Sequence, residues 1–110
     1  MATNYKVLGQ AALTAETETD VYTVPAATEV IISTIAVCNR SATANSFRVA
    51  LRPDGATLAN EHYLIYDTPV EGNDTTFITV GITADAGDVV TVYSGASAEI
   101  TISIFGSEVS

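Results

Sequence analysis

Short runs of β-branched and aromatic residues recur along the whole chain, and Gly, Pro, Asn, Asp and Ser separate them at short intervals. This pattern is typical of β-strands, and no segment shows the apolar spacing of an amphipathic helix. It predicts eight strands, at residues 5–13, 20–24, 29–39, 46–52, 62–68, 75–83, 88–94 and 98–105. The stretch ATLANEHYLIYD has room for one helical turn and no more. Because a chain of 110 residues forms one domain, we predict a single all-β domain spanning residues 1–110.

The predicted strands end at residues that have a physical reason to interrupt a ladder. Pro25 has no N–H to donate, and the turn at residues 53–55 combines Pro, which fixes φ, with Gly, which accepts positive φ. Residues 71–74 form a second loop of this kind. We expect residues 84–88 to connect two strands tightly and residues 94–97 to close a short hairpin.

The alternation of side chains locates a core. In three predicted strands one face is apolar, as a two-sheet sandwich requires, through Phe47, Val49, Leu51, Ile78, Val80, Ile82, Ile100, Ile102 and Ile104. The strands at residues 29–39, 62–68 and 88–94 instead carry apolar or small residues on both faces. Since no helix is predicted that could cover the second face, we expect another copy of the chain to cover it. The predicted subunit interface comprises Val30, Ile32, Tyr63, Tyr66, Val89 and Tyr93.

Composition argues against several classes of partner. The 13 acidic and 4 basic residues give a net charge of −9, which disfavours binding to nucleic acid and to anionic lipid. The charged fraction of 15% is low and the mean hydropathy is +0.30, which agrees with apolar surface covered by other subunits. No apolar run approaches the ~20 residues of a transmembrane helix, and the start MATNYKVLGQ lacks the features of a signal peptide. We therefore expect synthesis in the cytoplasm without a signal peptide, and no nucleic-acid or membrane partner.

The basic residues suggest a contact with a partner. If Arg48 and Arg52 share a strand, they point to the same face, where they either anchor an acidic neighbour or pair with acids of this chain. Residues 1–10 form a possible N-terminal arm, which could reach a neighbour by adding a strand. The predicted partner-binding residues are Tyr5, Lys6, Val7, Arg48 and Arg52.

The acidic residues form two patterns. Glu16, Glu18 and Asp20 alternate with threonines, so on an extended segment they share one face, either as a solvated edge or as a contact with a basic partner. Four further acids lie in two loops, and they would bind calcium if the loops met at one end of the sandwich, or otherwise stay solvated. These are Glu71, Asp74, Asp85 and Asp88.

No constellation of residues indicates catalysis. The only histidine, His62, would need Asp67 or Glu61 as its orienting acid, and the chain has neither a GxSxG motif nor a catalytic-cysteine context. The single cysteine, Cys38, excludes an internal disulfide, and its apolar surroundings predict a small buried core residue. The chain has no Trp, the residue that most often forms the flat aromatic surface on which a glycan stacks. We predict a protein that is not an enzyme and has no cofactor and no metal site.

The run VYTVPAATEVIISTIAVCNRSATANSFRVALRPDGATLANEHYLIYD is followed by NDTTFITVGI, GDVVTVYSG and ISIFGSE. From about residue 21 to residue 108, these segments resemble a group of small virion proteins of tailed bacteriophages. In that group a VYTVPA strand precedes a long apolar strand ending in CNR, and FRVAxRP, HYLIYD-like and NDTxxxTxGI segments follow. The resemblance implies a jelly-roll-like antiparallel β-sandwich with a structural role in the particle.

This likeness leads to an expected function. We expect a non-enzymatic capsid cement or decoration protein, on the surface of the virion, that forms a homotrimer and stabilises the capsid lattice. Its partners would be itself and the major capsid protein or another virion protein. The alternatives are a tail adaptor or fibre component, and a carbohydrate-binding module used for adsorption to the host cell.

Overall fold

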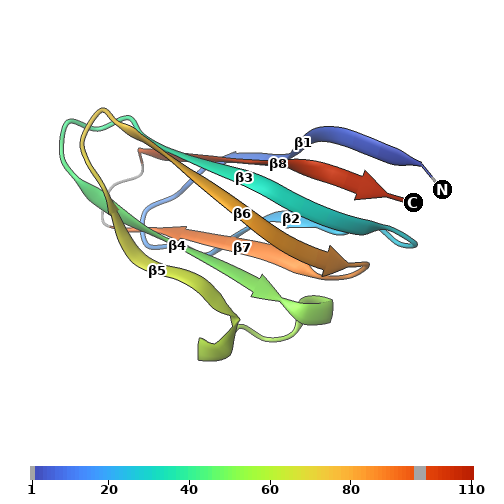
Figure 1. The fold of residues 1–110 in the computed structure, drawn as a ribbon. Helices are drawn as coiled ribbons and strands as arrows, with labels where there is room; N and C mark the ends of the chain where they lie inside the picture. The colour runs from blue at the N-terminus through green and yellow to red at the C-terminus, as the bar shows by residue number, and fades with distance from the viewer. Residues whose placement is uncertain (1, 96–98) are drawn as a thin grey trace.

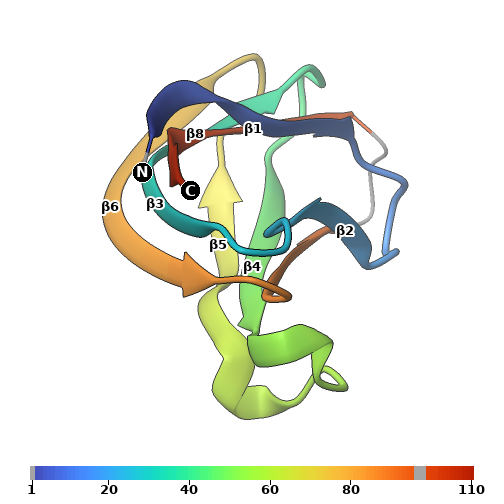
Figure 2. The ribbon, with the colours of Figure 1, turned by 90° about the vertical axis from the view of Figure 1, so that its right-hand side faces the viewer.

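The computed structural model describes residues 2–95 and 99–110 and arranges them in two four-stranded antiparallel sheets (Figure 1). The first, which we call the long sheet, has the order β1 (Thr3–Ala12), β8 (Ile100–Val109), β3 (Glu29–Asn39) and β6 (Thr75–Asp85). The second, the short sheet, has the order β2 (Thr19–Thr23), β7 (Val89–Ser94), β4 (Asn45–Arg52) and β5 (Tyr63–Val70). The two sheets lie face to face with the core between them (Figure 2), so the prediction of an all-β sandwich is confirmed.

The strand order is that of a jelly roll. Strands β4 and β5 pair as the innermost hairpin, and β3 with β6, β2 with β7 and β1 with β8 pair around it in succession. Apart from the β4–β5 hairpin, each connection between consecutive strands crosses from one sheet to the other. This is the nested pattern of a jelly roll. The connection at residues 84–88 is short, as predicted, but it too crosses between the sheets. The predicted hairpin at residues 94–97 is wrong, because β7 and β8 belong to different sheets; residues 96 and 97 lie outside the described part of the chain.

The predicted strands agree with the observed ones to within two residues at each end, except at the last strand. β8 continues to Val109 instead of ending at residue 105, and its predicted start at residue 98 lies outside the described residues. Gly106 permits the extension, because a Cβ atom there would lie 2.1 Å from the carbonyl oxygen of Ile31 on the neighbouring strand. The single helical turn expected before the fifth strand is a 3-10 turn at Asn60–His62, and a similar turn forms at Pro53–Gly55.

A β-bulge in β3 explains why that strand looks apolar on both faces. Ile32 pairs with Gly106 and Thr34 pairs with Phe105, so Ser33 is an extra residue that shifts the alternation by one position. Val30 and Ile32 before the bulge, and Ile35 and Val37 after it, therefore all point into the core. Val30 and Ile32 are each 1% exposed, so their assignment to a subunit interface is wrong.

Strand β7 is buried on both faces without the help of another subunit. It lies between β2 and β4, and its inner side chains Val90 and Val92 belong to the core. On its outer face Arg52 donates a hydrogen bond to Thr91, and Arg48 lies over the ring of Tyr93. Val89 is 7% exposed, so its assignment to a subunit interface is also wrong. Arginine stems of the same chain provide the cover that we expected from a neighbour.

Candidate functional site

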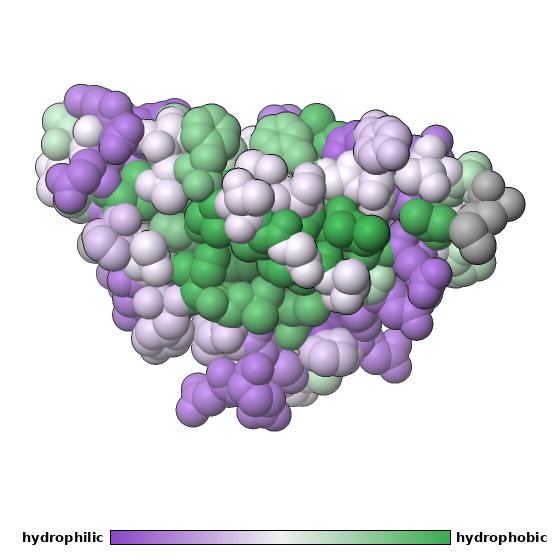
Figure 3. Space-filling view, in the orientation of Figure 1, coloured by the Kyte–Doolittle hydropathy of each residue, from purple (hydrophilic) through white to green (hydrophobic). Residues whose placement is uncertain are grey.

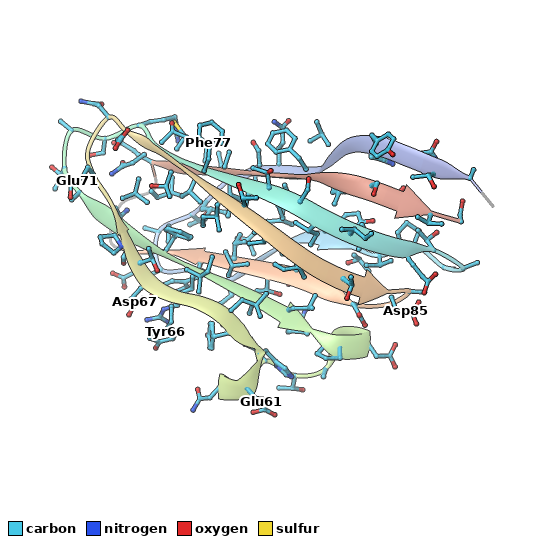
Figure 4. The ribbon with its side chains drawn as sticks, viewed as in Figure 1. Glu61, Tyr66, Asp67, Glu71, Phe77 and Asp85 are labelled. Atoms are coloured by element: carbon cyan, nitrogen blue, oxygen red, sulfur yellow. The ribbon has the colours of Figure 1, made fainter. Side chains whose placement is uncertain are left out.

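The acids proposed as calcium ligands do not come together. Glu71 and Asp74 precede β6, whereas Asp85 is its last residue and Asp88 follows it. The two pairs therefore lie at opposite ends of this 11-residue strand (Figure 4). The calcium hypothesis is wrong for this set. Among residues 2–95 and 99–110, no group of three or more His, Cys, Asp or Glu side chains is placed to hold a metal ion.

Asp88 and His62 organise local turns. The carboxylate of Asp88 accepts hydrogen bonds from the backbone N–H groups of Asp54, at 2.8 Å, and Asp85, at 2.9 Å. These contacts tie the turn after β4 to the loop between β6 and β7. The Nδ1 atom of His62 accepts a hydrogen bond of 3.0 Å from the N–H of Ala59 and so closes the 3-10 turn before β5.

The outer face of the short sheet carries an arginine–tyrosine cluster, formed by Arg48, Tyr63, Tyr66, Asp67 and Tyr93. The guanidinium carbon of Arg48 lies 4.1 Å from the ring centroid of Tyr66 and 4.4 Å from that of Tyr93. Arg48 also donates two hydrogen bonds to the carboxylate of Asp67, from Nε at 2.6 Å and from an Nη atom at 3.2 Å. These hydrogen bonds lower the pKa of Asp67 and raise that of Arg48.

Irregular pairing of β5 with β4 brings this cluster together. The register shifts between Phe47 and Val49 and again between Val49 and Ala50, and Asp67 has a φ of 50°. The sequence placed Tyr63 and Tyr66 on opposite faces, whereas their rings meet edge to face with centroids 4.9 Å apart. The only sequence signal for the irregularity is Asp67 itself, since Asp tolerates positive φ better than most residues.

Arg52 is also held by partners in its own chain. Its guanidinium donates to both carboxylate oxygens of Asp20 at 3.1 Å and to the hydroxyl of Thr91 at 3.0 Å. It donates further hydrogen bonds to the carbonyl oxygens of Gly55 and Ala56. Of the two roles considered for Arg48 and Arg52, the structure therefore shows pairing with acids of this chain.

The acidic segment before β2 is not continuously extended. Glu16 has a φ of 52° and its N–H donates to the carbonyl oxygen of Ser94, which places a turn there. Asp20 lies on the outer face of the short sheet, where it pairs with Arg52. The expectation that Glu16, Glu18 and Asp20 share one face of an extended segment is wrong, because this turn interrupts the alternation.

The N-terminal segment is part of the long sheet and not a free arm. β1 pairs with β8 along its length, and Ala2 and Ser110 exchange backbone hydrogen bonds of 2.7 and 2.9 Å, so the two ends of the chain lie side by side (Figure 1). Lys6 points inward and its ammonium group lies 3.0 Å from Glu108. Tyr5 and Val7 point outward and are 87% and 47% exposed.

The outer face of the long sheet is nearly free of charge. Its outward positions hold apolar, Ser, Thr, Gly and Gln residues, and the two charged ones, Glu29 and Asp85, lie at one end of the sheet. Cys38 lies on this face and is half-buried, which corrects its expected place in the core. Four of the large hydrophobic residues that are exposed lie here: Tyr5, Val7, Ile31 and Phe77.

A second apolar surface lies where the sandwich opens between its edge strands β5 and β6. Ile78, Val80 and Ile82 of β6 and Ile65 of β5 pack against the core but are only partly buried. Figure 3 shows hydrophobic residues gathered in one broad area between the two sheets on this side. We call this surface the β5–β6 opening.

Of the predicted interface residues, three stay accessible. Tyr63, Tyr66 and Tyr93 all belong to the arginine–tyrosine cluster, and Tyr66 is 57% exposed (Figure 4). The two apolar surfaces, by contrast, were missed. Ile31 and Phe77 alternate with core residues in the sequence. The alternation alone does not show which set faces outward, because bulges shift it and leave no clear sequence pattern.

Within the described ranges, no helix has the length and apolar character needed to cross a membrane. Comparison of the chain with protein-family models, with curated proteins and with solved structures found no match.

Proposed function

We propose that this chain is a non-enzymatic structural protein of a tailed-phage virion, and most simply a homotrimeric decoration protein that stabilises the capsid lattice. The likeness of its strand and turn segments to small phage virion proteins supports the proposal. The observation that carries it from the structure is the outer face of the long sheet, which has few charges and exposes Tyr5, Ile31 and Phe77, on a chain of net charge −9. Such a face favours association, while the acidic remainder keeps assembled particles apart.

The proposed mechanism is burial of apolar surface. Contacts between copies cover apolar side chains. The assembled protein then bridges neighbouring capsid subunits through the surface that these contacts leave exposed. Lys6, Arg48 and Arg52 have partners within the chain, so they are poor anchors for a lattice. Tyr66, which is exposed on the short sheet, is a better candidate for contact with the major capsid protein or another virion protein.

The test is a phage in which the gene for this chain is deleted. Heads from the deletion should lose DNA or break at a lower temperature than wild-type heads, and addition of the purified chain should restore them. Labelled chain should bind those heads to a saturable, stoichiometric level. Heads of unchanged stability that bind no added chain would contradict a capsid role.

A carbohydrate-binding adsorption module is the second candidate, and the arginine–tyrosine cluster favours it. Exposed tyrosine rings beside an arginine are a surface on which a sugar ring can stack. In this case, deletion of the gene should leave heads intact and reduce adsorption to host cells. A glycan-array signal that disappears in Tyr66→Ala would support this role, and reduced adsorption without such a signal would favour a tail adaptor or fibre component.

A further inference from the structure

The molecule has two apolar surfaces of different shape. The outer face of the long sheet is broad, and Tyr5, Ile31 and Phe77 stand on it with exposed fractions of 87%, 47% and 69%. The β5–β6 opening is a flank of the sandwich where the core reaches the surface between two edge strands. β6 borders both surfaces, because it is the edge of the long sheet and one side of the opening.

The edge of β6 has fewer protecting features than the other edges, and the one that it has is a bulge between Thr79 and Ile82 in its pairing with β3. β1 contains Lys6, β2 is five residues long and contains Asp20, and β5 contains Asp67 and Pro69. β6 has neither a charge nor a proline before its last residue, Asp85. Natural edge strands usually carry such features because an unprotected edge pairs with other chains.

The charge distribution indicates that a second copy is the occupant. Two copies that each carry −9 repel one another, and they can approach closely only where carboxylates are absent. The long-sheet face meets this condition, since its carboxylates, Glu29 and Asp85, lie at one end and Arg40, which donates to Thr101, lies at the other. The side chains that define the β5–β6 opening are all apolar. A strongly basic partner would gain more from the acidic loops than from either surface.

We infer that copies of this chain associate head to tail, with the β5–β6 opening of one copy packed against the long-sheet face of the next. A contact between two identical surfaces would leave the other surface of each copy in water, whereas a head-to-tail contact covers both. Head-to-tail contacts form a ring when the rotation closes, and the smallest such ring is a trimer. The inference rests on the self-association in the proposed function and assigns its two surfaces.

The available area suits such a contact. A sheet face of four strands, with about ten residues each, covers roughly 600 Å² from the usual rise and strand spacing. Counting both partners, a contact that covers the whole face would bury at most roughly 1,200 Å², which is at the lower end of stable interfaces. A closed ring gains stability because every copy makes two contacts.

The first experiment measures mass in solution by light scattering. The wild-type protein should show the mass of three chains of 11.5 kDa each. Ile31→Glu on the face and Val80→Glu at the opening should each raise, more than tenfold, the concentration needed for the trimer. Tyr5→Glu tests the face at a residue that is 87% exposed, where folding is not at risk. Circular dichroism checks that Val80→Glu, at a partly buried residue, is folded. Thr57→Glu adds the same charge on an exposed loop and should leave the trimer unchanged.

A mixing experiment tests the head-to-tail arrangement. Tyr5→Glu keeps an intact opening and Val80→Glu keeps an intact face, so an equimolar mixture should form a complex of two chains. Neither variant should form that complex alone. A contact between identical surfaces predicts no new complex on mixing, and that result, or a wild-type protein that is monomeric at high concentration, would overturn the inference.

The heads of the deletion phage separate this inference from the proposed function. If the variants fail to trimerise and also fail to stabilise heads, the head-to-tail inference and the capsid role are both supported. If the wild-type chain is monomeric but still stabilises heads, the inference fails and the capsid role stands. If the chain trimerises as expected but neither binds nor stabilises heads, the inference stands and the capsid role fails.

Discussion

The hydroxyl of Tyr22 on the short sheet donates a hydrogen bond of 2.5 Å to Glu108 on the long sheet, whose other oxygen lies 3.0 Å from the ammonium group of Lys6. This contact joins the two layers at the end of the core where both chain termini lie. Burial, together with the bond to Glu108, raises the pKa of Tyr22 above its usual range, and the bonds from Tyr22 and Lys6 lower the pKa of Glu108.

Tyr22→Phe should reduce the free energy of unfolding by about 1–2 kcal/mol, because it removes a hydrogen bond to a charged group while the ring is kept. Urea denaturation followed by circular dichroism measures the change. Tyr5→Phe, at a ring that is 87% exposed, is the control and should alter stability by less than about 0.5 kcal/mol. Equal effects of the two substitutions would show that the bond across the sheets contributes nothing.

Stability should fall as the pH drops below about 4.5 and 3.8, the ordinary pKa values at which the unfolded chain protonates Glu108 and Asp67. Both groups have lowered pKa values in the folded protein, so the unfolded chain binds protons first as the pH falls. At the other end, stability should fall as the pH rises past about 10, because the unfolded chain loses the Tyr22 proton first. Melting temperatures measured across both ranges test this, and Glu108→Gln should flatten the acid side.

Arg48→Lys should destabilise the short sheet by about 1 kcal/mol, because lysine cannot reproduce the planar contact with two rings and the paired bonds to Asp67. A double-mutant cycle between Arg48→Met and Asp67→Asn measures the coupling of the ion pair, because these substitutions remove both charges. We expect this coupling to be small, since Asp67 is exposed. Identical denaturation curves for wild type and Arg48→Lys would contradict this prediction.

Gly106→Ala should destabilise the protein by about 1–3 kcal/mol, because the added Cβ atom would lie 2.1 Å from the carbonyl oxygen of Ile31. Gly81→Ala is the matched control in the same sheet, since a Cβ atom there meets nothing within 4 Å. It should be neutral or slightly stabilising because alanine restricts the unfolded chain. Chemical denaturation of the pair shows whether close approach of β8 and β3 requires glycine.

Alternation and turn residues alone were enough to predict the strands and the sandwich class. The third predicted strand, residues 29–39, coincides with β3, because β-branched residues and the flanking polar residues define it locally. The same local pattern could not show which side chains of that strand face inward. Ser33 reverses the alternation, and a bulge depends on pairing with β8, a strand far away in the sequence.

The sequence by itself therefore determined an acidic, all-β chain of eight strands, because strand propensity, turn chemistry and net charge are local or additive properties. Only the tertiary structure decided that Arg48 and Arg52 cover the outer face of the short sheet, and that the face with few charges and exposed hydrophobic residues belongs to the long sheet. The reason is physical: which surfaces remain exposed depends on strand pairing and bulges, and these are settled between residues that are distant along the chain.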